Sequence, residues 1–361
     1  MKIRLTALDT LFFRDGKPFD KGEETWASGI FPPSPSSFYG ALRSLYFVNN
    51  PQEISKAGEN NDPTKALIIK DIQLIVDDAL GFLCPADLVK VKDDDDDIVL
   101  LNLKKKNSTQ ITSDTIFKDF MLSSDEEVES LVGTDLIVGV SLNDYLNSES
   151  PYTTTKIANK VTLEPKVGIA RDNNTHVTED GRLYRVGMIR PEDDEANKLS
   201  FDVSFELDGL DLNIGDKGFL KLGGESKAMS YEVIADTSLT AFENNGNYFK
   251  VFLTTPAIFK NGWYPSFLNK NNDFKGIFNG INVQLIAASI GKPKYIGGFD
   301  IKNRKPKPMT KVVAEGAVYF FKVLDEGAEF TLYHPFSISD DKVEEGFGVA
   351  YCAAVTEQLE L

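Results

Sequence analysis

The chain has 361 residues, and its 39 Lys and Arg against 55 Asp and Glu give a net charge of −16 at pH 7. Hydrophobic residues make up 42% of it, which excludes whole-chain disorder, and no stretch approaches the about 20 apolar residues of a membrane span. Two Cys and two His exclude a disulfide framework and a four-cysteine zinc site. The length predicts about two domains, and the composition predicts a soluble, cytoplasmic protein with no cofactor and no structural metal.

The amino-terminal segment is predicted to form a strand, a loop and a helix. Residues 3–8 alternate between apolar and polar side chains, as an opening strand requires. A loop rich in glycine and aromatic residues follows up to residue 33 and carries Arg14 and Lys17. Ser34 and Pro35 then begin a predicted helix over 34–48, whose apolar residues recur at helical spacing.

The rest of the chain reads mainly as strands separated by loops. In the first half, strand patterns cover 66–77, 80–91, 98–103, 156–163 and 182–190. Residues 165–181 contain turn-forming Asn and Gly pairs and predict a long projecting hairpin. In the second half, alternation over 201–207 opens a further series of strands, with one helix near 265–278. Strands outnumber helices and no βαβ rhythm appears, which predicts an α+β fold of two sheets.

Charge is distributed unevenly along this acidic chain. Between residues 292 and 311 there are seven basic residues and one acid, which gives the window a net charge of +6 and leaves −22 for the rest. The window also contains Tyr295, Phe299 and the pair Gly297-Gly298, while three prolines predict irregular structure. A cationic, glycine-rich loop can bring backbone N–H groups and positive charge to phosphates, and its rings can stack on bases. The alternative is an ordinary solvated loop.

The start of the predicted helix is a second candidate anion site. Backbone N–H groups at a helix start favour a negative charge, and three serines lie there: Ser34, Ser36 and Ser37. The preceding loop adds Arg14 and Lys17, in a segment whose first 47 residues have a net charge of +1. The structural alternative is capping of the helix by Ser34, with Arg14 paired to Asp15 or Asp9.

No motif of a catalytic class is present. The sequence lacks a P-loop, an HExxH motif and a GxSxG motif. His176 is a candidate general base of a ribonuclease, with Arg171 or Lys166 near it in the sequence to stabilise a phosphate. An isolated His at a polar hairpin tip is more typical of an exposed side chain than of a catalytic one. His334, before Pro335, is likewise interpreted as non-catalytic. These residues therefore favour binding over catalysis.

Seven segments, spread over nearly the whole chain, resemble one CRISPR-associated family. The opening carries LDTLFFRDGKPFDKG (8–22) and then FPPSPSSFYGALRS (31–44), in an order and spacing specific to that family. The later segments are GRLYRVGMIRP (181–191), LGGES (222–226), GKPKYIGGFDIKNRKPKP (291–308), VVAEGAVYFFKV (312–323) and GFGVAY (346–351). The family is the third subunit of the type III-B (Cmr) effector complex, a member of the RAMP superfamily. One departure is Glu315, where the family tends to show a proline.

The resemblance implies two ferredoxin-like (RRM-like) modules, 1–155 and 156–361, the second with the hairpin 165–181 and the glycine-rich loop 291–311. It also implies a non-catalytic RNA-binding subunit that holds the 5′ handle of the crRNA. The implied protein partners are the large polymerase/cyclase-like subunit and the first backbone RAMP subunit, to which target cleavage belongs. Two alternatives stay open: a metal-independent endoribonuclease that processes precursor CRISPR RNA, and a scaffold that binds only proteins.

On this interpretation, three segments form one cleft that clamps the handle, and the hairpin projects beside them as a thumb. The candidate RNA-binding residues of the amino-terminal loop and the helix are Arg14, Lys17, Ser34, Ser36, Ser37, Tyr39 and Arg43. Those of the glycine-rich loop are Lys294, Gly297, Gly298, Phe299, Lys302, Arg304, Lys305 and Lys307. Those of the hairpin are Arg171, His176 and Arg182. Lysines and arginines would neutralise phosphates, glycines would let the backbone approach, and Tyr39 or Phe299 would stack on a base.

Overall fold

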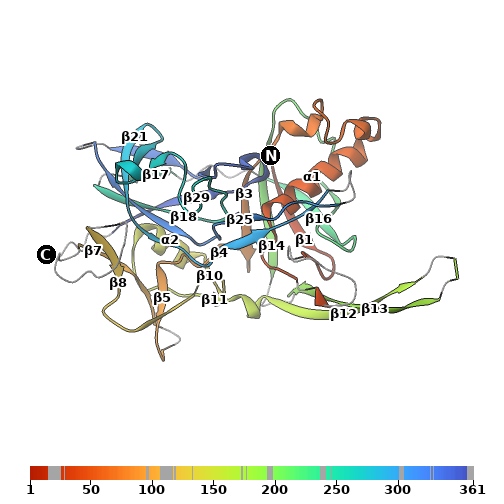
Figure 1. Ribbon diagram of the computed structural model, residues 1–361, viewed down its shortest axis with the longest axis horizontal. Coiled ribbons are helices and arrows are strands. Elements are labelled where there is room, and N and C mark those ends of the chain that lie inside the picture. Colours follow the sequence, from red (N-terminus) through yellow and green to blue (C-terminus); the bar gives the residue numbers. More distant parts are fainter. Residues whose placement is uncertain are drawn as a thin grey trace.

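The structure is a computed structural model that describes residues 1–14, 26–27, 29–94, 97–105, 117, 119–131, 133–171, 174–175, 177–192, 198–235, 241–244, 246–300, 305–325, 327 and 329–355. These residues form mostly β-sheet, with two α-helices, α1 (Pro35–Asn49) and α2 (Val140–Asn147). Most of the long strands belong to two large sheets (Figure 1). In the part of the chain described, no helix is long and apolar enough to cross a membrane.

The first large sheet has eight strands, and β1 is an interior strand of it. In spatial order they are β11 (Thr155–Lys156), β10 (Asp135–Val138), β4 (Ala79–Leu83), β3 (Leu67–Val76), β14 (Leu199–Leu207), β1 (Lys2–Ala7), β16 (Ala228–Ile234) and β15 (Lys217–Lys221). All their pairings are antiparallel. The predicted opening strand is confirmed. Strands β1, β3, β4 and β10, from before residue 155, share this sheet with β14, β15 and β16, from after residue 156.

Helix α1 covers one face of the first sheet. Its apolar stripe includes Phe38, Leu42 and Leu45, which are buried against sheet residues such as Ile3 and Phe201. The rings of Phe38 and Phe201 lie 5.2 Å apart in an edge-to-face arrangement, a favoured aromatic geometry. The predicted helix over 34–48 is therefore confirmed. The apolar residues whose spacing predicted it are the ones that pack against the first sheet.

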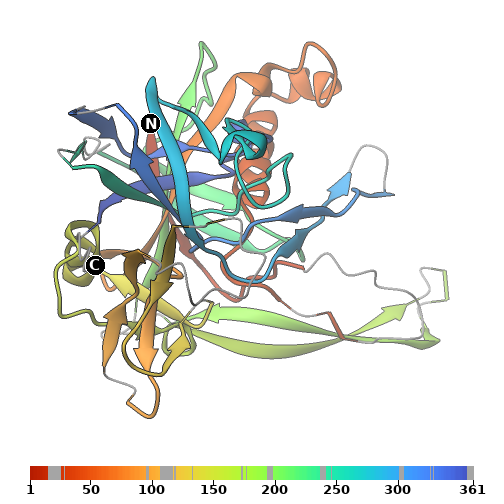
Figure 2. The same cartoon turned by 60° about the vertical axis from the view of Figure 1, so that its left-hand side comes forward.

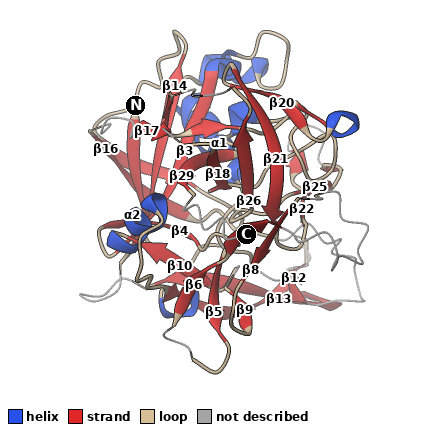
Figure 3. Cartoon of the chain, turned by 90° about the vertical axis from the view of Figure 1, so that its left-hand side faces the viewer, coloured by secondary structure: helices blue, strands red, loops and turns tan. Residues whose placement is uncertain are grey.

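The second large sheet has seven strands and two covered faces. In spatial order they are β19 (Leu268–Asn269), β20 (Lys275–Phe278), β21 (Ile281–Ser289), β26 (Val318–Val323), β18 (Tyr248–Leu253), β29 (Val349–Ala354) and β28 (Phe336–Ser337). Along β18, Phe249 and Val251 pack into a core within this half of the chain, whereas Phe252 packs toward the first half. Figure 3 shows the two sheets side by side, with β14 and β16 at one side and β20 and β21 at the other.

The helix predicted near 265–278 is wrong. This stretch forms β19, the 3₁₀ turn η4 (Lys270–Asn272) and β20. Asp273 and Phe274 have positive φ angles of 49° and 55°, which an α-helix does not allow. Gly276 pairs so closely that an added Cβ would lie 2.1 Å from the carbonyl oxygen of Phe267. The apolar spacing comes instead from rings such as Phe278, which packs on Phe267 and Phe321.

Smaller elements fill the space around the two large sheets. A three-stranded sheet joins β6 (Ile98–Leu100), β5 (Leu88–Val91) and β9 (Val128–Ser130), and two-stranded ribbons join β7 (Asn102–Lys105) to β8 (Phe120–Ser123) and β17 (Ala241–Asn244) to β27 (Phe330–Tyr333). The remaining 3₁₀ turns are η1 (Pro51–Lys56), η2 (Pro63–Ala66), η3 (Ile157–Asn159) and η5 (Val343–Glu345).

The predicted projecting hairpin is confirmed, and it is longer than its sequence signal. Strands β12 (Val161–Arg171) and β13 (Thr178–Pro191) pair antiparallel and extend away from the body of the molecule (Figure 1). Between its base and its far end, β13 pairs in parallel with β2 (Trp26–Ala27). The hairpin is therefore part of a small three-stranded sheet whose third strand comes from the amino-terminal segment.

The glycine-rich loop 291–311 is more regular than its prolines predict. Strand β22 (Lys294–Ile296) pairs with β25 (Thr310–Val312), and β23 (Phe299–Asp300) pairs with β24 (Lys305–Pro306). Pro306 is tolerated because a two-stranded ribbon has free edges where a missing N–H costs nothing. The expectation of an irregular loop is therefore wrong for these residues, which form a narrow ribbon.

Candidate nucleic-acid interface

Exposed lysines are the main chemical feature of the glycine-rich loop. Lys292, Lys305, Lys307 and Lys311 are all exposed, and none has an ion-pair partner in the described part of the chain. The backbone N–H of Lys307 donates to the carbonyl oxygen of Gly298 at 2.8 Å, which fixes the ribbon beside the Gly297-Gly298 pair. Lys302 and Arg304 lie outside the described residues, as does the side chain of Phe299. The ribbon thus presents unneutralised positive charge to solvent.

Lys294 differs from the other lysines because it is already paired. Its Nζ binds the carboxylate of Glu315, which is 6% exposed and stands at the turn after β25. The next residue, Gly316, has φ +84°, and an added Cβ would lie 2.8 Å from the carbonyl oxygen of Cys84. This close turn docks the ribbon's base on the first half of the molecule. Glu315, the departure from the family pattern, therefore fastens the base of the loop.

The start of α1 holds the three serines in different environments. Ser36 Oγ donates to the carboxylate of Glu345 in η5, and Ser37 N–H donates to the carbonyl oxygen of Ser34 at 2.8 Å. Ser34 occupies the N-cap position with extended backbone angles but makes no side-chain capping bond. Its Oγ is buried without a hydrogen-bond partner in the described part of the chain. The capping alternative is therefore not what this helix uses, and a carboxylate already lies at its positive end.

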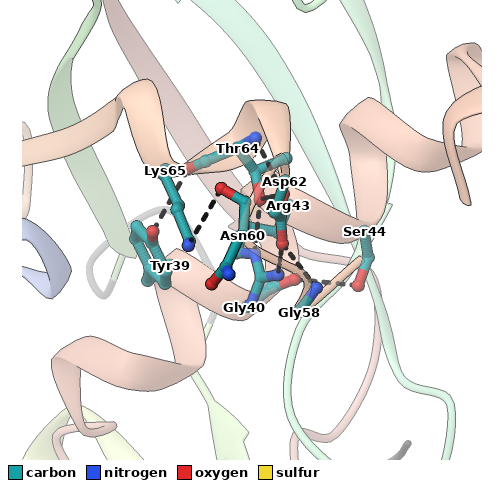
Figure 4. A network of polar contacts seen from close by, with 9 residues as sticks. All are labelled: Tyr39, Gly40, Arg43, Ser44, Gly58, Asn60, Asp62, Thr64 and Lys65. Carbon is teal, nitrogen blue, oxygen red and sulfur yellow. Dashed lines mark hydrogen bonds and ion pairs between the residues drawn. The ribbon is translucent and has the colours of Figure 1, made fainter. Parts of the chain in front are cut away.

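Tyr39 and Arg43 belong to a network that binds residues 58–65 to α1 (Figure 4). Arg43 donates from Nε to Thr64 Oγ1 at 2.7 Å and from Nη2 to Asp62 Oδ2 at 2.5 Å. Asp62 also accepts from the backbone N–H groups of Gly58 and Thr64, at 2.7 and 2.9 Å. Tyr39 Oη donates to the carbonyl oxygen of Thr64 at 3.2 Å, and the guanidinium of Arg43 lies 5.7 Å from its ring centre.

The charge of Asp62 is stabilised by this network. Burial by itself raises the pKa of Asp62, but hydrogen bonds from Thr64 and Gly58 and the positive charge of Arg43 outweigh it, so that the pKa lies below its ordinary value. A guanidinium engaged in this way has an intramolecular partner for its charge. Arg43 therefore supports the fold around α1, through donations from its Nε and Nη2.

Arg14 stands at the end of a well-anchored segment. Phe12 and Phe13 before it are buried, and the turn between β15 and β16 holds them, because Gly224 N–H donates to the carbonyl oxygen of Phe12 at 2.8 Å. A Cβ on Gly223 would lie 2.5 Å from that same oxygen, so the family-like GGE turn needs its glycine for this contact. Asp9 pairs with Lys227 at 2.9 Å rather than with Arg14. Arg14 is exposed beside this anchor, and Lys17 lies outside the described residues.

Two of the three candidate residues of the thumb-like hairpin lie on its described strands. Arg171 closes β12 and Arg182 lies within β13, though their side chains and the whole of His176 lie outside the described residues. Closer to the body, Arg190 pairs with Glu164 across the two strands. In Figure 2 this hairpin and the ribbon β22–β25 extend toward the same side of the molecule.

One short segment links the base of the glycine-rich loop to the start of α1. Phe347 is buried with Ile296 and Val312 of the ribbon, and Glu345, two residues earlier, holds Ser36. Sequence reasoning missed Glu345, because it is 309 residues from its partner and no local pattern marks it. Figures 1 and 2 both show the ribbon running beside α1. Two of the three predicted segments are thus neighbours.

The second histidine, His334, lies outside this region and has a structural role. His334 is buried, and its Nε2 accepts the backbone N–H of Cys352 at 2.9 Å. Burial lowers the pKa of His334 to about 4, so the ring is neutral near pH 7. Among the residues described, no three His, Cys, Asp or Glu side chains are grouped so that they could hold a metal ion.

Comparison with known proteins identifies the family. The chain matches the family model of the CRISPR-associated protein Cas_Cmr3 over residues 3–354. Its structure is similar to a chain of the type III-B Cmr-beta complex bound to cognate target RNA and AMPPnP, with 16% identity, a TM-score of 0.53, and coverage of 89% of this chain and 86% of that one. A second structure, Cmr-beta bound to cognate target RNA, gives 17% identity, a TM-score of 0.52 and the same coverage.

Among curated proteins, none matches the sequence significantly. The two structural matches share the fold with this chain, and the family model spans nearly all of the sequence. The expected resemblance is thereby confirmed from end to end. The chain belongs to the CRISPR-associated Cmr3 family of type III-B Cmr complexes.

Proposed function

We propose that this chain is a non-catalytic, RNA-binding subunit of a cytoplasmic type III-B Cmr ribonucleoprotein, and that it holds the 5′ handle of the crRNA. The observation that carries the proposal is the set of exposed, unpaired lysines on the glycine-rich ribbon: Lys292, Lys305, Lys307 and Lys311. In a chain of net charge −16, this concentration of exposed cations forms a local positive patch that attracts a polyanion such as RNA.

The proposed contacts divide by chemistry. Lys305 and Lys307, with Lys302 and Arg304, neutralise phosphates, and the Gly297-Gly298 backbone approaches the strand closely. Arg14, Lys17 and the serines at the start of α1 contact the same RNA strand. Ser36 does so by exchanging Glu345 for phosphate or a 2′-hydroxyl group. Lys294, Tyr39 and Arg43 act indirectly, because each is held by a partner within the chain.

The remaining parts of the proposal concern architecture and partners. The chain forms two ferredoxin-like modules of the RAMP type, and the hairpin β12–β13 acts as a thumb through Arg171, His176 and Arg182. The large polymerase/cyclase-like subunit and the first backbone RAMP subunit are its protein partners. The charge of −22 outside the basic window suits basic surfaces on those partners.

The test is charge reversal of the ribbon. Lys305→Glu with Lys307→Glu should lower the affinity of the assembled complex for handle-bearing RNA by about tenfold or more at physiological salt, and should flatten the salt dependence of binding. The matched control is Lys105→Glu with Lys270→Glu, which makes the same charge change at two exposed lysines outside the ribbon. Equal losses in both pairs, or no loss in the first, would contradict handle binding by this loop.

A further inference from the structure

The first sheet has a second face, and part of it is open. Along β15, Leu220 is buried in the cluster that contains α1. Because side chains alternate along a strand, Lys217, Phe219 and Lys221 point to the opposite face. All three are exposed, and Phe219 is 68% exposed. An aromatic ring thus stands between two lysines on a sheet face that α1 does not cover.

The surroundings of Phe219 are polar. Its cross-strand partner on β16 is Ser230, which pairs in turn with Thr6 on β1, and both are partly exposed. Lys217 forms an exposed ion pair with Glu232 at 2.7 Å, whereas Lys221 has no ion-pair partner among the described residues. The ring is therefore an apolar surface among hydroxyl, ammonium and carboxylate groups.

The second half of the molecule covers only the far side of this face. There Tyr351 of β29 donates to Asp71 of β3 at 2.9 Å, and Asp71 is 1% exposed. Four strand positions away across β14, β1 and β16, the edge strand β15 has no such cover over Phe219. The open part of the face is thus a strip at the edge of the sheet.

We propose that Lys217, Phe219 and Lys221, the Phe219 platform, bind a segment of single-stranded RNA. One unpaired base stacks on the ring, and the two lysines contact the phosphates on either side of it. The lysines lie four residues apart along the strand, about 13 Å, which is long enough to flank one stacked nucleotide. An apolar protein surface would need apolar neighbours around Phe219, and β15, β16 and β1 supply Lys, Glu, Ser and Thr instead. The charge of Lys221, which has no ion-pair partner among the described residues, complements a polyanion.

This platform is separate from the proposed handle site. It lies on the face of the sheet opposite α1, whereas the handle site lies around the start of α1 and the ribbon β22–β25. It would therefore hold a different stretch of the same strand or a second strand. The inference does not depend on handle recognition, because it rests on β15 and its neighbours in the first sheet.

The experiment uses the full-length chain carrying Lys305→Glu and Lys307→Glu, so that the glycine-rich ribbon does not mask the platform. The probe is a fluorescein-labelled 15-nucleotide oligouridylate at about 50 mM salt, where phosphate contacts are strong. Adding Phe219→Ala should raise the dissociation constant about tenfold, as expected for one lost stacking contact. Phe219→Leu should behave like alanine, because leucine keeps apolar area but has no flat ring. Ile277→Ala, at another exposed apolar strand residue, is the matched control and should leave binding unchanged.

Two further measurements test whether the RNA binds at residues 217–221. Ultraviolet crosslinking to the oligouridylate should label a peptide containing residues 217–221, and Lys221→Glu should reduce the slope of log affinity against log salt by about 0.7. Parental affinity after adding Phe219→Ala, parental affinity after adding Phe219→Leu, or no measurable binding by the parent double variant would each overturn the platform. None of these outcomes bears on handle-bearing RNA in the assembled complex, where the ribbon is tested.

Discussion

Asp71 is a carboxylate held inside the contact between the two halves of the molecule. Its Oδ2 accepts from Tyr351 Oη at 2.9 Å and from Gln73 Nε2 at 2.7 Å, while its Oδ1 has no partner among the described residues. Burial raises the pKa of Asp71 to about 6, against the two hydrogen bonds and the charge of Lys2, which lower it. Because of this raised pKa, the Asp71 carboxylate takes up a proton just below neutral pH.

The raised pKa of Asp71 predicts a specific pH dependence of the free energy of unfolding. The folded-state pKa lies above the ordinary value of 3.8, so between about pH 4 and pH 6 the folded state holds a proton that the unfolded state has lost. Stability attributable to Asp71 should therefore fall as pH rises through that window, by about 3 kcal/mol in total. Asp71→Asn should remove this part of the slope, as measured by denaturant unfolding from pH 4 to pH 7. Asp78→Asn, at an exposed carboxylate, is the control, and identical slopes in wild type and Asp71→Asn would contradict the assignment.

At the scale of elements, helix α1 shows which features the sequence predicts and which it does not. Its apolar spacing and Pro35 predict the helix correctly, because those signals are local and the same residues pack in the core. The roles of its polar residues are not local. Ser36 binds a residue 309 positions away, and Arg43 binds a loop that folds back over the helix, so candidate RNA contacts and structural contacts look alike in the sequence.

The same distinction explains the errors elsewhere. The residues 265–278 carry a helix-like apolar spacing, but their shape follows the left-handed angles of Asp273 and Phe274 and the close pairing of Gly276. The composition of the glycine-rich loop predicts its positive charge. The pairing of its strands, β22 with β25 and β23 with β24, depends on cross-strand contacts that the composition does not show. Glu315 reads as a departure from the family pattern, and only its distant contact with Lys294 shows what it does.

Arg43 gives an element-scale prediction. Arg43→Met leaves the buried carboxylate of Asp62 without its cationic partner, so the free energy of unfolding should fall by about 3 kcal/mol. Lys65→Met, in the same loop, removes only an exposed bond to the carbonyl oxygen of Asn60 and should change stability by less than about 0.5 kcal/mol. Chemical denaturation of both variants measures the difference. A stable Arg43→Met protein with weakened RNA binding would instead return Arg43 to the RNA interface.

At the scale of the whole molecule, a buried charged cluster joins the two halves. Lys250 of β18 binds Asp87 at 2.9 Å, and both side chains are almost fully buried. Tyr145 of α2 donates to the same carboxylate at 2.9 Å, and its ring lies 3.9 Å from the ammonium group. Desolvation lowers the pKa of Lys250, against the charge of Asp87, which raises it. The cluster lies in the core formed by Phe252 and its neighbours from both halves.

A cluster of this kind fixes how the halves meet more than it adds stability, because desolvation of two charges offsets most of their attraction. Lys250→Met alone leaves the buried carboxylate of Asp87 without its cationic partner and should lower the free energy of unfolding by about 3–5 kcal/mol. Replacing the whole cluster with apolar groups, Lys250→Met with Asp87→Leu and Tyr145→Phe, should recover most of that loss, since no buried charge or hydroxyl is left unpaired. Denaturant unfolding followed by tryptophan fluorescence and by circular dichroism measures both variants. If the triple variant is no more stable than Lys250→Met, the cluster is instead a net source of stability between the halves.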